Sequence, residues 1–287
     1  MRFAASILVL SIVAALASPL AVASRDRDGD NERTDADGQI PRPAAKAYHD
    51  GRFILAATLC ESYGGAEALA FAARARIADA VTREDSSCFD CLLKAEAVAH
   101  EAIKRDATLA DAYVQLAVAI GFRGRLLSPF DAQSEGLPEK GRKAIDKALA
   151  LDPTNNWARA TLGAWHLEIV HRAGPVLAFT LYGASETLGV ETFRQALAVE
   201  PDSLLLHFHF ALSVLALDVN DFREEAQNVL GRGLSDPRSD ALTGIMRRHA
   251  RELRDLLEHG GEEEIARLVR GLQGYPRELE PAVAKQN

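Results

Sequence analysis

The residues best suited to chemistry lie in the segment GAWHLEIVHRAG, where His166, Glu168 and His171 occur within six positions. Such side chains could bind a metal ion or transfer protons. On a helix, however, His166 and His171 point about 140° apart around the axis, so they cannot bind one ion together. Glu168 and His171 share a face, but two ligands do not complete a zinc site. The spacing therefore predicts no metal, and we interpret the segment as one helix of a larger packing unit.

The aromatic residues beside this segment favour a structural role. Trp165 and His166 are expected to pack against the insert that follows Gly174, which contains Tyr182. A buried imidazole needs a hydrogen-bond partner, which we expect to be Glu168 or a backbone carbonyl. The sequence thus predicts a structural polar cluster of four side chains: Trp165, His166, Glu168 and Tyr182.

Catalytic motifs are not found elsewhere in the sequence. His207 and His209 would point about 200° apart on a helix. The chain contains neither a G-x-S-x-G elbow nor a phosphate-binding P-loop. We therefore expect no enzymatic activity, no metal and no cofactor.

The three cysteines are Cys60, Cys88 and Cys91, and the last two form the C-x-x-C pattern CFDC. Leu92 stands where a haem-attachment motif needs histidine, and a second C-x-x-C for zinc is missing. We expect Cys88 and Cys91 to form a local disulfide or to remain free thiols. Cys60 should be unpaired, because the second of three antiparallel helices would separate it from the others by about 25 Å, whereas a disulfide needs Cα atoms within about 7 Å. These expected helices are residues 44–62, 65–82 and 87–104.

Residues 1–23 predict export. An apolar run follows Arg2 and ends in Ala21-Val22-Ala23, which matches the cleavage site of a secretory signal peptide. The mature chain should begin at Ser24, be periplasmic or secreted, and have no membrane span after cleavage. Residues 24–43 contain almost no large apolar side chains and are expected to form a flexible acidic leader.

Composition and net charge limit the kinds of partner that the chain can bind. The chain has 287 residues, of which 48% are hydrophobic, enough for a packed core. Its net charge is −8. An acidic chain is a poor match for nucleic acid, which demands concentrated positive charge.

From Ala44 onward, apolar residues recur at three- and four-residue intervals, which predicts an all-α fold. Three segments align on Pro153, Pro201 and Pro237, and a fourth aligns with Ala107 in the proline's position. Apolar residues keep the same offset before each proline, which indicates an internal repeat. The residues eight positions upstream are Ile145, Phe193 and Val229.

The aligned segments resemble the tetratricopeptide repeat. Leu162-Gly163 and the segment FRQALAVEP correspond to parts of its signature, with His166 in the position of the tyrosine. Two of the repeat spacings, 46 and 48 residues, are longer than the family's. We assign the excess to two inserts, residues 123–140 and 172–189.

Over residues 92–259, these long-insert repeats are similar to those of the regulator of microtubule dynamics family and its bacterial relatives. The resemblance implies an all-α, right-handed superhelical array of antiparallel helix pairs, a tetratricopeptide-like solenoid with long inserts within its repeats. It also implies an interaction role rather than an activity. The matching residues are Gly163, Trp165, His166, Glu168, Tyr182, Gly183, Phe193, Ala196, Pro201, His207 and Ala211.

By the same resemblance, the first helix of each pair would line a concave groove. The inner positions are almost all apolar, and so long an apolar strip must be covered. Two alternatives could cover it. The inserts could fold over the strip through Pro129-Phe130 and residues 176–184, or a ligand or partner helix could bind there, anchored by Trp157 and Phe208. The predicted groove residues are Val114, Val118, Phe122, Trp157, Ala160, Ala164, Leu167, Leu205, Phe208, Leu212 and Leu215.

The folded domain is expected to span residues 44–274. Residues 240–260 form an apolar stripe with an Arg- and Glu-rich opposite face, which is typical of the capping helix of a repeat array. A shorter helix at about 262–273 should complete the cap, and residues 275–287 should be a mobile tail.

Together these features predict an exported helical-repeat interaction protein that binds a protein, a peptide or an apolar ligand in its groove. The alternative is an accessory component of a periplasmic solute-uptake system of the TRAP type, which rests on fold analogy. The oligomeric state is left open.

Overall fold

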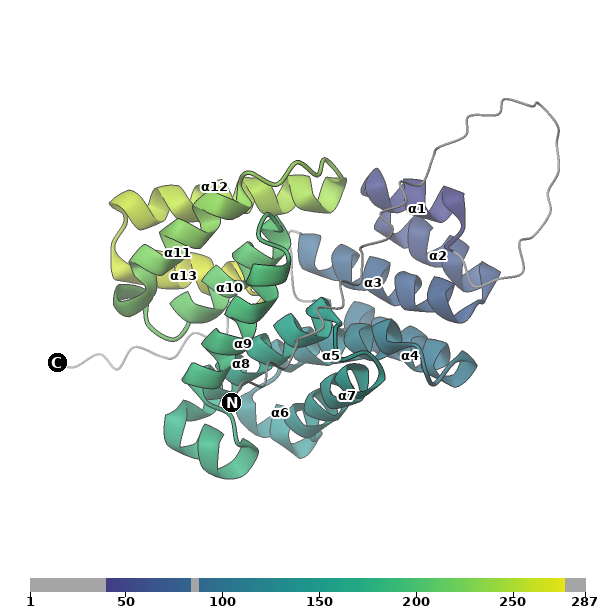
Figure 1. Cartoon of the computed structure of the whole chain (residues 1–287), viewed down its shortest axis with the longest axis horizontal. Coiled ribbons are helices and arrows are strands. Elements are labelled where there is room, and N and C mark those ends of the chain that lie inside the picture. The colour runs from purple at the N-terminus through teal and green to yellow at the C-terminus, as the bar shows by residue number, and fades with distance from the viewer. Residues whose placement is uncertain (1–39, 84–87, 277–287) are drawn as a thin grey trace, which may run out of the picture. The chain divides into compact units, whose positions relative to one another are not determined.

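The computed structural model describes residues 40–83 and 88–276. These residues form thirteen helices and no strand, so the predicted all-α fold is confirmed for this part of the chain (Figure 1). The expected signal peptide, most of the leader and residues 277–287 lie outside the described residues. The helices are α1 (Arg42–His49), α2 (Phe53–Tyr63), α3 (Ala66–Thr82), α4 (Phe89–Arg105), α5 (Ala110–Arg125), α6 (Pro129–Ser134), α7 (Leu137–Leu151), α8 (Asn156–Tyr182), α9 (Glu186–Val199), α10 (Leu204–Leu215), α11 (Val219–Gly233), α12 (Ala241–His259) and α13 (Glu262–Leu272).

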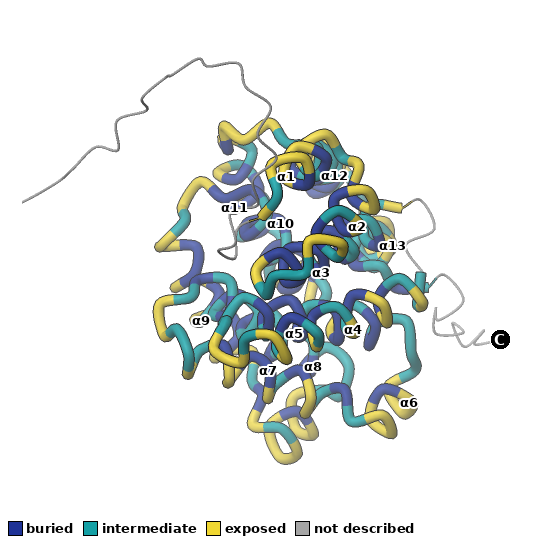
Figure 2. The backbone as a smooth tube through the Cα atoms, turned by 90° about the vertical axis from the view of Figure 1, so that its right-hand side faces the viewer, coloured by how far each residue is buried: buried dark blue, intermediate teal, exposed yellow. Residues whose placement is uncertain are grey.

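Most neighbouring pairs are helices that follow one another in the chain, among them α2 with α3, α8 with α9, and α10 with α11. Helix α5 pairs with α7, because the short α6 lies between them in the chain. Several helices begin at a polar residue whose side chain accepts a hydrogen bond from a backbone N–H of the first turn, as expected for N-caps. Figure 2 shows buried residues where neighbouring helices meet and exposed residues on their outer faces. The N-caps are Ser128, Asn155, Ser185, Asp218 and Asp240.

The first expected helix, 44–62, is divided in two. Helix α1 ends at His49, and Gly51 adopts φ 80°, a left-handed conformation that favours glycine and ends the helix. The folded region also begins earlier than residue 44, since α1 starts at Arg42 and Ala44 is already fully buried.

The cysteines are placed as the helical order predicts. Cys88 and Cys91 form a disulfide with a Cα–Cα distance of 5.3 Å. Cys60 is a free, buried thiol whose pKa is raised to about 11, chiefly by burial.

The two inserts take different forms. The first contains the short helix α6, between α5 and α7. The second continues α8 beyond a kink at Gly174, where φ is 74° and ψ is 159°. Pro175 follows directly and cannot donate a backbone hydrogen bond, so the helix changes direction at this point.

The C-terminal helices contact helices that are distant in the chain as well as their sequence neighbours. Helix α12 packs on α11 and α10 and also contacts α1 and α3. After α13, the chain returns to the middle helices, where Tyr275 is only 8% exposed and donates a hydrogen bond to Glu168. The boundary expected after residue 274 therefore lies too early, because Tyr275 is part of the packed structure. Among the described residues, no helix is long and apolar enough to cross a membrane.

Candidate ligand pocket

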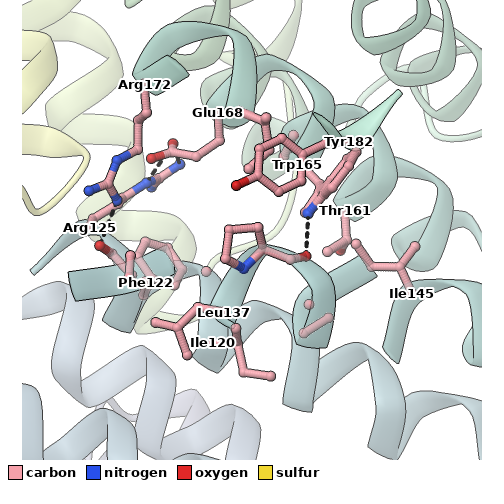
Figure 3. A pocket seen from close by; sticks show the side chains of 18 of the residues that line it. Ile120, Phe122, Arg125, Leu137, Ile145, Thr161, Trp165, Glu168, Arg172 and Tyr182 are labelled. Atoms are coloured by element: carbon pink, nitrogen blue, oxygen red, sulfur yellow. Dashed lines mark hydrogen bonds and ion pairs between the residues drawn. The ribbon is translucent and has the colours of Figure 1, made fainter. Parts of the chain in front are cut away.

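A cavity of about 450 Å³ lies between α5, α6, α7 and α8 (Figure 3). This volume falls within the range of small-molecule sites. Most of the side chains around it are apolar, and one side chain each from α9 and α10, Phe193 and His209, completes the lining. The larger apolar side chains in the lining are Val118, Ile120, Phe122, Leu137, Ile145 and Ile169.

Small residues leave this space open. Gly121, Gly141, Ala160 and Ala164 border the cavity from three helices. A Cβ atom added at Gly121 would meet nothing within 4 Å. Large side chains at these positions would fill the space between the three helices. Because the residues are glycine and alanine, part of that space remains as the cavity.

One side of the pocket carries a buried ion pair. Glu168 Oε2 accepts a hydrogen bond of 2.9 Å from Arg125 Nε, and the Tyr275 hydroxyl donates to its other oxygen. The side chains of Arg125 and Glu168 are only 13% and 16% exposed. Burial alone would raise the pKa of Glu168, but the charge of Arg125 and the hydrogen bonds from Tyr275 and Arg125 outweigh it, so the pKa is lowered. The carboxylate is therefore ionised and fully used by the protein.

Arg172 lies four residues after Glu168 on α8 and also lines the pocket. Its two terminal nitrogens donate hydrogen bonds of 2.6 Å to the carbonyl oxygen of Gly124 and 2.7 Å to that of Leu127. These carbonyls belong to the C-terminal end of α5, where a positive charge is favourable. Figure 3 shows Arg125, Glu168 and Arg172 grouped on one side of the pocket.

The opposite side of the pocket is aromatic. Trp165 Nε1 donates a hydrogen bond of 2.9 Å to the carbonyl oxygen of Pro138, and the guanidinium of Arg142 lies 5.1 Å from the centroid of its ring. The Tyr182 hydroxyl donates to the side-chain oxygen of Gln133. Both aromatic residues thus present their rings to the cavity while their polar atoms are satisfied by the protein.

The histidines do not form a site. His209 lines the pocket, and burial together with the nearby charge of Arg125 lowers its pKa to about 4, so it is neutral at physiological pH. His166 is buried, accepts a hydrogen bond of 3.4 Å from the backbone N–H of Ser185, and has a pKa lowered to about 4, first by burial and then by the charge of Arg142. The expectation that Glu168 or a backbone carbonyl satisfies His166 is wrong for the described residues, because the partner of His166 is the backbone N–H of Ser185 and Glu168 is bonded to Arg125 and Tyr275.

The predicted polar cluster is therefore divided. Trp165, Glu168 and Tyr182 line the pocket, whereas His166 lies beside the start of α9. The sequence indicated these three lining residues through the repeat motif. It did not indicate Arg125, Arg172, His209 or Tyr275, which follow no repeat offset.

The predicted groove is also divided. Val118, Phe122, Ala160 and Ala164 line the pocket. Trp157 and Leu205 are partly buried against the largest core cluster. The others are buried in the packed interior and form no open surface: Val114, Leu167, Phe208, Leu212 and Leu215.

The inserts cover the apolar helix faces only in part, since Ala178 and Ala184 are buried but several larger apolar side chains of the inserts are exposed. Phe130 is 80% exposed, Val176 is 72% exposed and Phe179 is 66% exposed, and Leu177 and Leu181 are exposed as well. We name Phe130, Val176, Leu177, Phe179 and Leu181 the apolar collar. Leu177 and Leu181 also line the pocket, and the other three lie on the same two inserts. The two inserts thus carry five exposed apolar side chains, of which Leu177 and Leu181 border the cavity.

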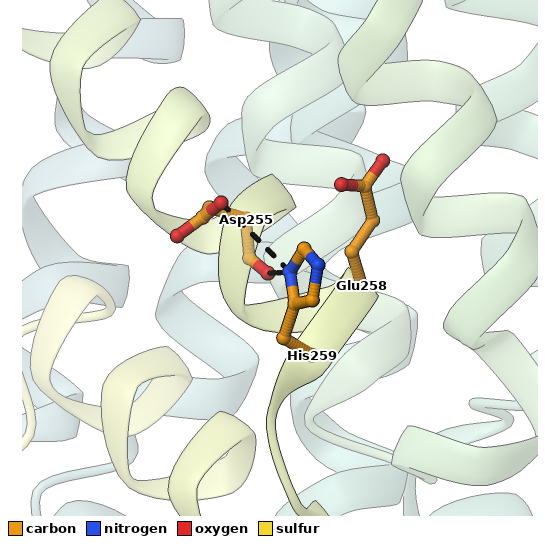
Figure 4. Close-up of side chains that lie close together, drawn as sticks. All are labelled: Asp255, Glu258 and His259. Atoms are coloured by element: carbon orange, nitrogen blue, oxygen red, sulfur yellow. Dashed lines mark hydrogen bonds and ion pairs between the residues drawn. The ribbon is translucent and has the colours of Figure 1, made fainter.

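A second group of side chains has the residue types that bind metal ions. Asp255, Glu258 and His259 lie within one turn at the end of α12, with one potential ligand atom from each within 4.8 Å of the others (Figure 4). All three are exposed, and His259 lies near the Asp255 carboxylate and backbone carbonyl. Exposed acidic groups are common on protein surfaces without a bound ion, and we assign no metal to this one.

No protein-family model matches this sequence, and comparison with curated proteins finds no significant match. The fold and the site define a class: an all-α protein of paired helices with an apolar pocket between them.

Proposed function

We propose that this chain is an exported, tetratricopeptide-like helical-repeat binding protein that holds an apolar ligand in the pocket between α5 and α8, without catalytic activity. One observation carries the proposal: the cavity of about 450 Å³ is lined mostly by apolar side chains. A preformed cavity of this kind is the usual form of a small-molecule site.

The apolar collar supports the same proposal. Exposed apolar side chains on both inserts would lower the cost of transferring an apolar ligand from its source to the cavity, because the ligand need not cross a hydrated rim. A continuous peptide groove along the inner helix faces is less well supported, since Phe208 and Leu212 are only 1% and 2% exposed.

The test compares two glycine variants. N-phenyl-1-naphthylamine, a neutral dye that fluoresces in apolar sites, should bind the full chain. Gly121→Leu should weaken this binding by about tenfold or more, because the new side chain occupies space that a ligand needs. Gly231→Leu is the matched control, since a Cβ atom there also meets nothing within 4 Å but the residue lies on α11, outside the pocket.

Gly231→Leu should bind the dye as the unmodified protein does. If the unmodified chain does not bind the dye, or if Gly121→Leu binds it with full affinity, the pocket is not the site.

A further inference from the structure

We infer that the pocket selects amphiphiles with an anionic head group, such as a single-chain carboxylate, and that Arg172 is the residue that determines this selectivity. The inference rests on the proposed function and names the ligand class for the same pocket.

The charges that line the pocket do not balance. Of the described lining residues, Arg125 and Arg172 are cationic, Glu168 is anionic and His209 is neutral. Two positive charges and one negative charge leave a surplus of one positive charge beside an apolar cavity. A buried surplus of this kind favours an anion and opposes a cation.

The surplus belongs to Arg172. Glu168 is four residues earlier on the same helix face, but its oxygens accept from Arg125 and from Tyr275. Arg125 is further used by a hydrogen bond to the carbonyl oxygen of Gln273. Among the described residues, Arg172 donates to two neutral carbonyl groups, those of Gly124 and Leu127, whose partial charges offset part of a unit charge.

Arg172 also keeps donors for a ligand. A guanidinium has five N–H donors, and the two carbonyl bonds use one on each terminal nitrogen. The Nε–H group and one further N–H on each terminal nitrogen are left for an acceptor. A carboxylate at this position would form charge-assisted hydrogen bonds, while the chain would lie against the apolar side chains Phe122, Ile120 and Leu137.

The test uses three probes with the same chain and different head groups. Dodecanoate, 1-dodecanol and dodecylammonium are each used to displace N-phenyl-1-naphthylamine from the full chain at neutral pH. We expect dodecanoate to bind about tenfold more tightly than dodecanol, because the carboxylate adds the attraction of a full negative charge for Arg172, whereas the hydroxyl accepts a hydrogen bond without carrying a charge. Dodecylammonium should bind most weakly.

Substitutions then assign the selectivity to a residue. Arg172→Gln should remove the preference for dodecanoate over dodecanol while dodecanol binding stays nearly unchanged. The matched control is Arg223→Gln: Arg223 also donates to two backbone carbonyls near a helix end, those of Leu257 and Gly260, but it lies outside the pocket. This control should keep the preference.

A second variant keeps the inference falsifiable if Arg172→Gln fails to fold. Glu168→Gln removes the only negative charge among the described lining residues, so the preference for dodecanoate should increase several-fold. Equal binding of the three probes would overturn the inference while leaving an apolar pocket in place. A preference for dodecanoate that persists in Arg172→Gln would overturn the role of Arg172. Loss of dye binding in the unmodified chain would instead contradict the proposed function itself.

Discussion

Two regions of this protein use the same arrangement of paired helices with opposite results. In the pocket half, α5 to α8, glycine and alanine occupy facing positions and two inserts interrupt the pairs, so a cavity remains. In the closed half, α10 to α13, large apolar residues occupy the facing positions and α10 is joined to α11 by the short turn Ala216–Asp218. Side-chain volume at the helix contacts therefore decides whether a pair of helices encloses a site or a core.

The closed half shows this through α10. Nearly every residue of this helix is buried, including Leu206, Phe208, Phe210 and Leu212. They belong to one cluster that also includes apolar residues of α12 and α13. Such close packing makes the interior of this half sensitive to loss of side-chain volume.

The largest expected effect contrasts one residue from each half. Phe208→Ala should lower the free energy of unfolding by about 3–5 kcal/mol, because it leaves a cavity in the closed core. Leu177→Ala, in the exposed collar, should change it by less than about 0.5 kcal/mol. Chemical denaturation measures both. Similar losses for the two variants would show that the collar is packed in solution and would contradict the comparison.

A smaller effect on stability is expected when one glycine from each half is replaced by alanine. A Cβ atom at Gly233, in the closed half, would lie 2.8 Å from the Cβ atom of His207, so Gly233→Ala should cost about 1–3 kcal/mol. Gly121→Ala, in the pocket half, meets nothing within 4 Å and should stabilise its helix by up to about 1 kcal/mol. Thermal unfolding should therefore show shifts of opposite sign. A loss of stability in Gly121→Ala would mean that the pocket is narrower than the structure shows.

The last effect compares two titratable groups by pH: His209, which lies on α10 but lines the pocket, and Asp236, which does not line it. His209, at the pocket, has a pKa of about 4 in the folded state, below its ordinary value of 6.5, because burial disfavours its charged form. The unfolded chain then binds more protons between these values, so this residue makes stability fall as the pH drops from about 6.5 to about 4. The variant His209→Gln should reduce that slope in denaturation experiments.

Asp236, beside the closed half, responds in a lower range. Burial alone would raise its pKa, but hydrogen bonds from Arg238 and from the backbone N–H of Leu204 hold it at about 2. Its contribution is complete above the ordinary value of 3.8 and is lost as the pH falls through about 2. The variant Asp236→Asn should therefore flatten only this lower range. If either variant changes the other's pH range, the two groups are coupled and the regions are not independent.

Much of the fold could be predicted from the sequence. The three- and four-residue spacing of apolar side chains predicted helices, and the prolines Pro153 and Pro201 mark the turns that precede α8 and α10. Helix formation depends on local periodicity and capping, which one stretch of sequence contains in full. The break at Gly51 was missed because apolar residues continue on both sides of it.

The candidate site was predicted only in part. Val118, Phe122, Trp165, Glu168 and Tyr182 were singled out through the repeat pattern, and all five line the pocket. The same pattern placed Phe208 and Leu212 in a groove, although they are buried. The spacing of apolar residues shows which face of a helix is apolar. It does not show whether that face packs against a core or borders a cavity, so the two cases have the same sequence pattern.

The sequence by itself determined that the described chain is helical, that its helices pair, and which faces are apolar. Only the tertiary structure decided which of those faces enclose a cavity and which charges remain unbalanced beside it. Arg125, Arg172 and Tyr275 come from three distant parts of the chain, and their balance with Glu168 depends on distances of a few ångströms. Coulombic and hydrogen-bond energies depend on separation in space, which is set when α5, α8 and the segment after α13 pack together.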